Sequence, residues 1–435
     1  MYKRKWQAVF LSVLLITSFG CGSLNSLETA TPLTSEKINQ PPTLRVSAPD
    51  VDAAEPAIAK SADGNVFVAW VEHGVEKAAN VLVQSFDKNG KPTGEKVQVN
   101  PQSGQATAWR GDPPSVAVGK DGAIYVVWTA RVAAEEGNPT DIYLSASRDN
   151  GRSFTPPVKV NDDKVPVSHG MHSLAVDKNG QVYVAWLDDR NIKKEPSPLA
   201  PTAPANGEKP KHQHMKEPNR EVFFSVSTDG GKTFSANKKI ADEVCPCCKT
   251  SLLAADDGKL YASWRQVLPV DFRHIAVVSS DDKGNTFSKP TIVSDDQFFI
   301  EGCPVSGASL LADNNSLKVL WFTAGKAGPP GLYLAESKDN GKTFAPRVLV
   351  SEGLPTGTPS LLADGNNKYS VVWGADTQKV YLKNAETSKM TDTDGKEMMA
   401  GELPTATIVG GNVVASYIKK EEGKRGIWLS VLSAR

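Results

Sequence analysis

The sequence predicts an all-β fold built from one unit that is repeated along the chain. The clearest copy is AVDKNGQVYVAW at residues 175–186, in which an apolar stub, a polar turn and a strand ending in Trp follow one another. Asn-Gly and Asp-Gly between apolar segments are the strongest local signal of a β-hairpin, because the turn positions need positive φ. Related segments end at Trp70, Trp128, Trp264, Trp321, Trp373 and Tyr417. A repeat of about 50 residues made of short strands is typical of a propeller or another repeat array.

A second motif follows the first in most copies. It reads SRDNGRSF at residues 147–154, STDGGKTF at 227–234, SDDKGNTF at 280–287 and SKDNGKTF at 337–344, with a degraded copy at 85–90. In such a turn Asp accepts backbone N–H bonds and Gly supplies positive φ. The pattern resembles the Asp box of the sialidase-like (BNR-repeat) β-propellers. The resemblance implies that these boxes are structural and lie on the face opposite the binding site.

The number of hairpins predicts the number of blades. Seven hairpins end in Trp or Tyr, whereas the classical sialidase propeller has six blades, so we predict seven, with six as the alternative. Residues 43–47 form an isolated strand before the first hairpin. In a propeller of this kind an N-terminal strand completes the last blade, which removes two open edges. We therefore predict one propeller domain over residues 43–435.

The N-terminus has the pattern of an export signal. Three basic residues at 3–5 precede an apolar segment at 6–16, and Cys21 follows. The segment resembles a bacterial lipoprotein signal, in which residues 1–20 are removed and Cys21 is lipidated, although Ser18 stands where Leu is usual. An ordinary cleaved secretory signal is the alternative. Residues 21–42 are polar and predict a flexible tether. Both readings export the chain to an oxidising compartment, and lipidation anchors it in the membrane of the bacterial cell envelope.

Composition argues against some partners. The 435 residues include 49 basic and 49 acidic side chains, so the formal net charge is zero. No basic stripe indicates nucleic-acid binding. We expect a monomer whose partners are the membrane, through the lipid, and a glycan or a small anionic ligand.

Strand connectivity predicts where functional side chains gather. In each unit the hairpin turn joins the first two strands and the Asp box joins the last two, so both turns share one face. The connections into the first strand and out of the second share the other face, around the mouth of a central channel. A long insertion at 191–220 also leaves a second strand and is predicted to be a loop over this mouth. The candidates at these connections are Arg110, Asp112, Arg131, His169, His172, Asp188, Asp189, Arg190, Cys245, Cys247, Cys248, Arg265, Arg273, Glu301 and Cys303.

Four cysteines remain after Cys21. CPCCKTSLLA and CPVSGASLLA align Cys245 with Cys303 in consecutive units, so Cys245, Cys247, Cys248 and Cys303 are predicted to cluster. One or two disulfides are one interpretation, because an exported protein permits them. A copper or zinc site that includes His169 and His172 is another, because thiolates and imidazoles suit Cu(I) and Zn(II). A free or redox-active thiol is the third.

The arginines indicate an anionic ligand, because a guanidinium can donate two parallel hydrogen bonds to one carboxylate. The sialidase resemblance implies three arginines around a carboxylate, and Arg110, Arg131, Arg190, Arg265 and Arg273 are the ligand-binding candidates. Pairing of each with a local carboxylate, such as Arg190 with Asp188 or Asp189, is the alternative. Acid–base catalysis needs two facing carboxylates, and its candidates by position are Asp188, Asp189, Asp112 and Glu301. Arg110, Arg131, Arg190 and Arg265 are further catalytic candidates through the same resemblance.

Two functions remain open on the sequence. The first is a lipid-anchored envelope propeller that binds a carbohydrate or a soft metal at its mouth. The second is an exo-acting glycoside hydrolase of sialidase type. A sialidase needs three convergent arginines and a Tyr hydrogen-bonded to a Glu at the mouth, and the sequence motifs identify neither the third arginine nor that pair.

Overall fold

The computed structural model describes most of the chain after the N-terminal segment. The described residues are 42–75, 78–107, 109, 111–134, 137–192, 218–300, 302, 304–313, 316–365, 368–386 and 395–433. They belong to a compact unit that spans Gln40–Arg435. Almost all regular structure in them is β-strand, apart from a short 3-10 helix at Pro269–Asp271. None of the described segments is a helix that is long and apolar enough to cross a membrane.

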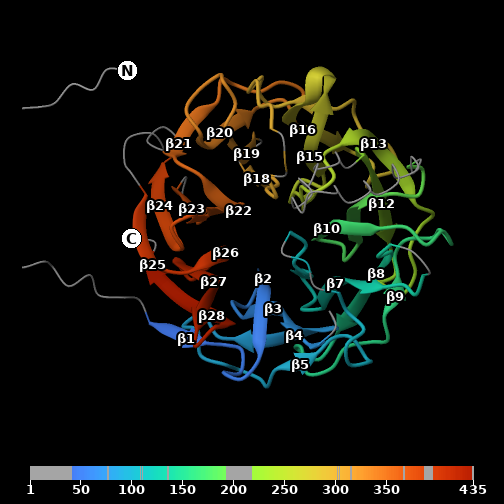
Figure 1. The fold of residues 1–435 in the computed structure, drawn as a ribbon, viewed down its shortest axis with the longest axis vertical. Helices are drawn as coiled ribbons and strands as arrows, with labels where there is room; N and C mark the ends of the chain where they lie inside the picture. Colours follow the sequence, from blue (N-terminus) through green and yellow to red (C-terminus); the bar gives the residue numbers. More distant parts are fainter. Residues whose placement is uncertain are drawn as a thin grey trace, which may run out of the picture. The chain divides into compact units, whose positions relative to one another are not determined.

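The strands form five four-stranded sheets and one eight-stranded sheet, which follow one another around a common centre (Figure 1). The first two sheets contain β2 (Asp52–Lys60), β3 (Val66–His73), β4 (Ala79–Phe86) and β5 (Val97–Gln98), then β6 (Ser115–Val118), β7 (Ile124–Arg131), β8 (Thr140–Ser147) and β9 (Val158–Lys159). The eight-stranded sheet contains β10 (His169–Val176), β11 (Val182–Asp188), β12 (Arg220–Ser227), β13 (Lys238–Val244), β14 (Ser251–Ala254), β15 (Leu260–Leu268), β16 (Phe272–Ser280) and β17 (Thr291–Ile292).

Three further four-stranded sheets complete the described unit. Two contain β18 (Ser309–Asp313), β19 (Ser316–Thr323), β20 (Gly331–Ser337) and β21 (Val348–Glu352), then β22 (Pro355–Ala363), β23 (Lys368–Ala375), β24 (Lys379–Glu386) and β25 (Lys396–Ala400). The third contains β26 (Glu402–Val409), β27 (Asn412–Glu421), β28 (Lys424–Ser433) and the N-terminal β1 (Thr43–Arg45). β1 pairs antiparallel with β28, with Leu44 opposite Leu429.

The turn between β10 and β11 shows why the repeated motif forms a hairpin. One carboxylate oxygen of Asp177 accepts the N–H groups of Asn179 and Gln181, at 2.8 and 2.9 Å. Gly180 has φ of 78°, whereas Asn179 is not among the residues with positive φ. The expectation that both turn positions need positive φ is therefore corrected: only the glycine adopts it, and the Asp side chain stabilises the rest of the turn.

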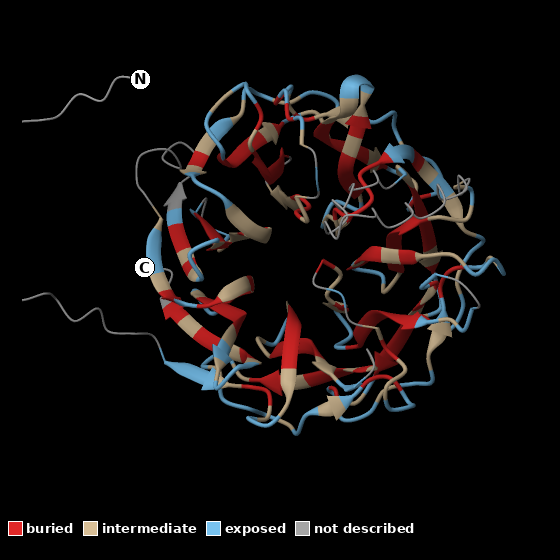
Figure 2. Cartoon of the chain, viewed as in Figure 1, coloured by how far each residue is buried: buried red, intermediate tan, exposed pale blue. Residues whose placement is uncertain are grey.

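The hydrophobic core lies between consecutive sheets. One cluster joins Tyr125 and Leu144 of β7 and β8 to Val184 and Trp186 of β11. Every residue of β11 is buried, because neighbouring sheets cover both of its faces. Figure 2 shows buried residues along the strands and exposed residues mainly at the outer edge and in the loops. The repeated Trp residues are thus core residues between sheets.

The Asp boxes form the tight turns that their sequence predicts. In the first box Ser147 Oγ donates to Asp149 at 2.7 Å and accepts the N–H of Gly151 at 2.9 Å. Asp149 also accepts the N–H of Ser153 at 2.9 Å. The boxes that contain Asp229, Asp282 and Asp339 repeat the Ser–Asp and Gly–Ser bonds. Each box therefore stabilises its own turn with local hydrogen bonds.

Candidate functional site

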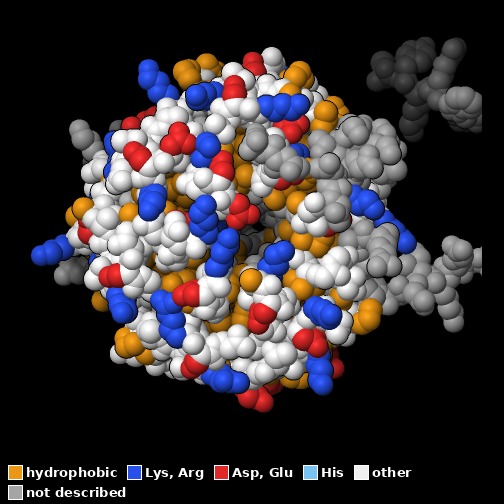
Figure 3. Space-filling model, turned by 180° about the vertical axis from the view of Figure 1, so that it is seen from behind, with side chains coloured by type: hydrophobic (Ala, Val, Ile, Leu, Met, Phe, Trp, Pro, Cys, Tyr) orange, Lys and Arg blue, Asp and Glu red, His pale blue; other side chains and the backbone are white. Residues whose placement is uncertain are grey.

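A cavity of about 700 Å³ lies where the first strands of the sheets meet. Residues of β2, β6, β10, β14, β18, β22 and β26 line it, together with the segments that lead into these strands. Figure 3 shows the molecule from behind, where the surface is hollowed near its centre and hydrophobic, basic and acidic side chains surround the hollow. The first strands and the segments that lead into them therefore enclose a space of ligand size.

A ring of hydroxyl groups lines this cavity. In each repeat one residue of the first strand pairs with the residue just before the repeated Trp or Tyr. Six of these residues have a hydroxyl group, namely Ser115, Ser173, Ser251, Ser309, Ser360 and Thr405, and the seventh is Ala57. Several hydroxyls bind the next sheet: Ser173 Oγ lies 2.9 Å from Thr250 Oγ1, and Ser360 Oγ accepts the N–H of Ala406 at 3.2 Å. These hydroxyl groups thus connect neighbouring sheets. Their regular position opposite the residue before each repeated Trp or Tyr is the sequence pattern that could have identified them.

Trp109 is the large aromatic side chain that the cavity exposes. It lies in the segment before β6, lines the cavity, and is 49% exposed. A Cβ atom on Gly111 would lie 2.5 Å from the Trp109 ring and 2.8 Å from Val305, so the glycine allows the ring to lie against the backbone. Trp109 directly precedes Arg110, which the sequence places at the mouth, but no sequence pattern predicts that the Trp109 ring is available to a ligand. That exposure depends on the neighbouring segments.

A polar cluster of Asp112, His172 and Lys249 lies beside the Trp109 segment. Lys249 lines the cavity, and its Nζ lies 3.6 Å from Asp112 Oδ1 and donates to the Pro113 carbonyl at 2.6 Å. His172 Nε2 lies 3.7 Å from the same Asp112 oxygen, and Nδ1 contacts Ser115 Oγ at 2.9 Å. Burial lowers the pKa of Lys249 to about 8 and that of His172 to about 4, although Asp112 opposes both shifts. At neutral pH the cluster therefore contains a charged Lys249 and a neutral His172.

The three described cysteines gather in one buried loop between β13 and β14. Cys245 Sγ lies 3.7 Å from Cys247 Sγ and 3.3 Å from Cys248 Sγ. Cys247 is in a disulfide, whereas Cys245 and Cys248 are free thiols. The three sulfur atoms lie within 4.8 Å of one another, but a sulfur in a disulfide is not a thiolate ligand. Cys303 and Cys21 lie outside the described residues.

Two predicted ligand-binding arginines lie near the cysteine loop and have other partners. Arg265 is fully buried, and its Nη2 donates to the carbonyls of Ser306 and Phe322 at 3.2 and 3.0 Å. Arg273 Nη1 lies 3.4 Å from Cys245 Sγ and donates to the Gly302 carbonyl at 2.9 Å. Arg265 therefore faces backbone carbonyls, and Arg273 faces a carbonyl, the Cys245 sulfur and the Asp271 carboxylate.

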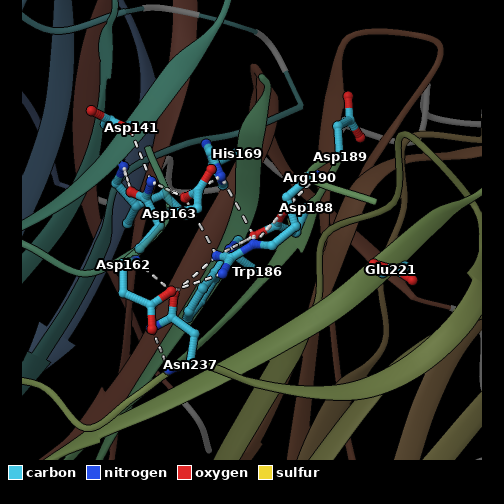
Figure 4. Close-up of polar contacts among 12 residues, drawn as sticks. Asp141, Asp162, Asp163, His169, Trp186, Asp188, Asp189, Arg190, Glu221 and Asn237 are labelled. Atoms are coloured by element: carbon cyan, nitrogen blue, oxygen red, sulfur yellow. Dashed lines mark hydrogen bonds and ion pairs between the residues drawn. The ribbon is translucent and has the colours of Figure 1, made fainter. Parts of the chain in front are cut away.

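A buried ion-pair network holds Arg190, as Figure 4 shows. Its Nη2 binds Asp188 at 2.8 Å, and its Nη1 binds Asp162 at 2.8 Å. The ring of His169 belongs to the same network, with Nδ1 2.5 Å from the Thr140 carbonyl and Nε2 3.5 Å from Asp188. Arg190 thus follows the alternative of local pairing, and neither His169 nor His172 belongs to the group of sulfur atoms.

The remaining predicted residues lie elsewhere. Arg131 is exposed at the end of β7. Asp189 forms an ion pair with Arg220 at 2.9 Å. Arg110, Glu301 and the 193–217 part of the insertion lie outside the described residues. Among the described residues that line the cavity there is no arginine, so the three-arginine arrangement is not formed by that part of the chain.

Comparisons with known proteins identify a family and a fold. The model of the BNR repeat-like domain family matches residues 64–382. A protein of unknown function from Dyadobacter fermentans DSM 18053 is similar in structure, with TM-score 0.52, 16% identity, and coverage of 90% of this chain and 98% of that one.

Two further solved structures are similar at comparable levels. The Hadza microbial sialidase Hz136 has TM-score 0.53 and 15% identity over 78% of this chain and 66% of that one. The polysaccharide lyase Uly1 has TM-score 0.53 and 13% identity over 88% and 90%. At these identities the likeness extends to the fold alone. Comparison with curated protein sequences gave no match.

Proposed function

Because this chain belongs to the BNR repeat-like domain family, we propose that it is a seven-bladed propeller that binds an acidic glycan in its central cavity. The observation that carries the proposal is the exposed Trp109 ring in a cavity that also contains hydroxyl groups and Lys249. Aromatic faces and hydrogen-bonding groups are the usual partners of sugar rings and their hydroxyls.

The sheet pairings support seven blades. The two halves of the eight-stranded sheet are joined by a single pair, Val244 with Gln266, so the sheet divides into β10–β13 and β14–β17. Seven hydrophobic clusters then each join two consecutive blades. The cluster that contains Val66 and Val414 joins the first blade to the last, and β2 contacts β26. The pairing of β1 with β28 supports closure of the ring by the N-terminal strand.

The charges in the cavity favour an acidic sugar. Glu55 lines the cavity, but its side chain is 1% exposed and its Oε2 lies 2.5 Å from His73 Nε2. The side chain of Lys249 is 18% exposed, and its partner Asp112 is 8% exposed. The charge that a ligand in the cavity meets is therefore mainly the Lys249 ammonium group, which attracts a sugar carboxylate.

Binding without hydrolysis fits the described residues better than the sialidase alternative. A sialidase mechanism requires several arginines and a tyrosine nucleophile around the sugar. The described residues that line the cavity include neither an arginine nor a tyrosine. The sialidase and the polysaccharide lyase of similar fold act on glycans, as their names indicate, which agrees with a glycan as the ligand.

Export and anchoring through Cys21 are part of the proposal. They rest on the signal pattern of residues 1–21, which lie outside the described residues. Fractionation of a bacterial host that makes the full chain tests them. Wild type should be recovered with membranes and Cys21→Ala in a soluble fraction; recovery of both in the same fraction would refute anchoring by Cys21.

The binding proposal is tested by calorimetric titration with 3′-sialyllactose, lactose and digalacturonic acid. We expect the two acidic sugars to bind more tightly than lactose. Trp109→Ala should weaken binding of the acidic sugars at least tenfold, about 1.4 kcal/mol. Phe299→Ala is the matched control, because Phe299 is equally exposed at 49% but does not line the cavity. Binding that is unchanged in Trp109→Ala, or absent for all three sugars, would overturn the proposal.

A further inference from the structure

The cysteine loop has the arrangement of a thiol–disulfide exchange site. Cys245 is a free thiol whose sulfur lies 3.7 Å from the sulfur of the disulfide-bonded Cys247 and 3.3 Å from the second free thiol, Cys248. Cys245, Pro246, Cys247 and Cys248 form a Cys-x-x-Cys sequence with its outer cysteines in contact. An attacking thiol, one sulfur of a disulfide and a resolving thiol are therefore all present in one loop.

The environment distinguishes the two free thiols. The Cys248 thiol and the N–H of Cys247 donate hydrogen bonds to Cys245, and Arg265 and Arg273 lie close, so the pKa of Cys245 falls to about 6. Arg273 Nη1 lies 3.4 Å from the Cys245 sulfur, while its Nη2 lies 3.5 Å from Asp271. Burial raises the pKa of Cys248 well above its usual range. Cys245 is thus the thiolate at neutral pH and Cys248 remains a thiol.

We propose that Cys245, Cys247 and Cys248 form an internal thiol–disulfide exchange site, with Cys245 as the nucleophile and Cys248 as the resolving thiol. In the first step an electron pair of the Cys245 thiolate forms a bond to Cys247 Sγ. The bond from Cys247 to its present partner breaks, and the partner leaves as a thiolate. In the second step Cys248 loses its proton and attacks Cys245 Sγ, and Cys247 leaves as a thiolate.

The two steps balance within the chain. One disulfide is broken and one is formed, so no external oxidant or reductant takes part. The proton that Cys248 gives up neutralises one of the two thiolates that leave, so one thiolate and one thiol are present before and after the exchange. The described cysteines are 3% exposed or less, which favours exchange within the loop over exchange with another protein. Among the described cysteines, Cys245 and Cys248 are free thiols, so neither is the present disulfide partner of Cys247.

The test is peptide mapping of the purified, exported chain without reductant. Protein is incubated at pH 5 and pH 7, quenched in acid, alkylated under denaturing conditions, digested, and analysed by mass spectrometry. In Cys248→Ser the Cys245–Cys247 disulfide should be at least tenfold more abundant than in wild type, because the resolving thiol is gone. Its rate of formation should rise about tenfold from pH 5 to pH 7, as the thiolate fraction of Cys245 increases.

Cys245→Ser is the control that lacks the nucleophile, and it should retain the original disulfide of Cys247 under all conditions. The wild-type protein should accumulate a Cys245–Cys248 disulfide, which is measured without any substitution. Thermal unfolding establishes that each variant is folded. Absence of both Cys245–Cys247 and Cys245–Cys248 peptides in folded wild type and Cys248→Ser would overturn the proposal. Stoichiometric copper or zinc in the purified protein, lost in Cys245→Ser, would replace exchange with metal binding.

Discussion

The guanidinium of Arg190 binds the carboxylate of Asp188 with Nε 3.0 Å from Oδ1 and Nη2 2.8 Å from Oδ2. Asp188 is completely buried and also accepts the indole N–H of Trp186 at 2.7 Å. The Arg190 guanidinium further lies 4.2 Å from the centre of the Phe223 ring. The sequence marked both residues as candidates for ligand binding or catalysis. In the structure they stabilise each other at the end of β11.

Asp188→Asn should destabilise the protein, because it leaves a partly buried arginine without its main counter-charge. We expect a loss of about 2–4 kcal/mol in the free energy of unfolding, measured with urea. Asp189→Asn is the matched control. Its ion pair with Arg220 has side chains 22% and 21% exposed, so its loss should cost less than about 1 kcal/mol. Equal effects of the two variants would contradict the central role of Asp188.

Binding of the acidic sugar should weaken as the pH rises from 7 to 9. Burial lowers the pKa of Lys249 to about 8, so the ammonium group is mainly charged at pH 7 and mainly neutral at pH 9. Affinity for 3′-sialyllactose should therefore fall through this window while that for lactose stays constant. In Lys249→Arg the decline should disappear, because arginine keeps its charge. Calorimetric titration at three pH values measures the effect, and a parallel decline for lactose would assign it to another group.

Acid should remove stability that the Asp boxes supply. Hydrogen bonds from Ser153, Thr286 and Thr343 lower the pKa of Asp149, Asp282 and Asp339, respectively, to about 2. A carboxylate with a lowered folded-state pKa stabilises the fold above its unfolded value near 4, and this contribution is lost as the pH falls to about 2.

The melting temperature measured between pH 5 and pH 2 checks this prediction. Asp339→Ala should melt at a lower temperature than wild type at pH 5, and the difference should shrink towards pH 2. Glu352→Ala, which changes an exposed acid outside the boxes, should follow the wild-type curve. A constant difference between Asp339→Ala and wild type over this range would show that the carboxylate charge does not matter.

The hairpins and Asp boxes could be predicted from the sequence because neighbouring residues decide them. The Asp177 carboxylate contacts N–H groups two and four residues later, and Asp149 contacts the N–H of Ser153. Such bonds form whenever the local chain adopts the turn. Strand connectivity likewise predicted that the connections into the first strands share one face, since alternate connections in antiparallel sheets lie on the same side.

The roles of the side chains at the centre depended on the tertiary structure. Arg265 finds its carbonyl acceptors at Ser306 and Phe322, and Lys249 meets Asp112 across sheets. These partners are distant in sequence. The packing of neighbouring sheets therefore decides whether the groups lie close enough to interact. The sequence by itself determined a repeated β-fold with Asp-box turns. Only the tertiary structure decided which of these side chains bind other groups of the chain and which face the cavity. The reason is that charge pairing, exposure and thiol chemistry depend on distances of a few ångströms.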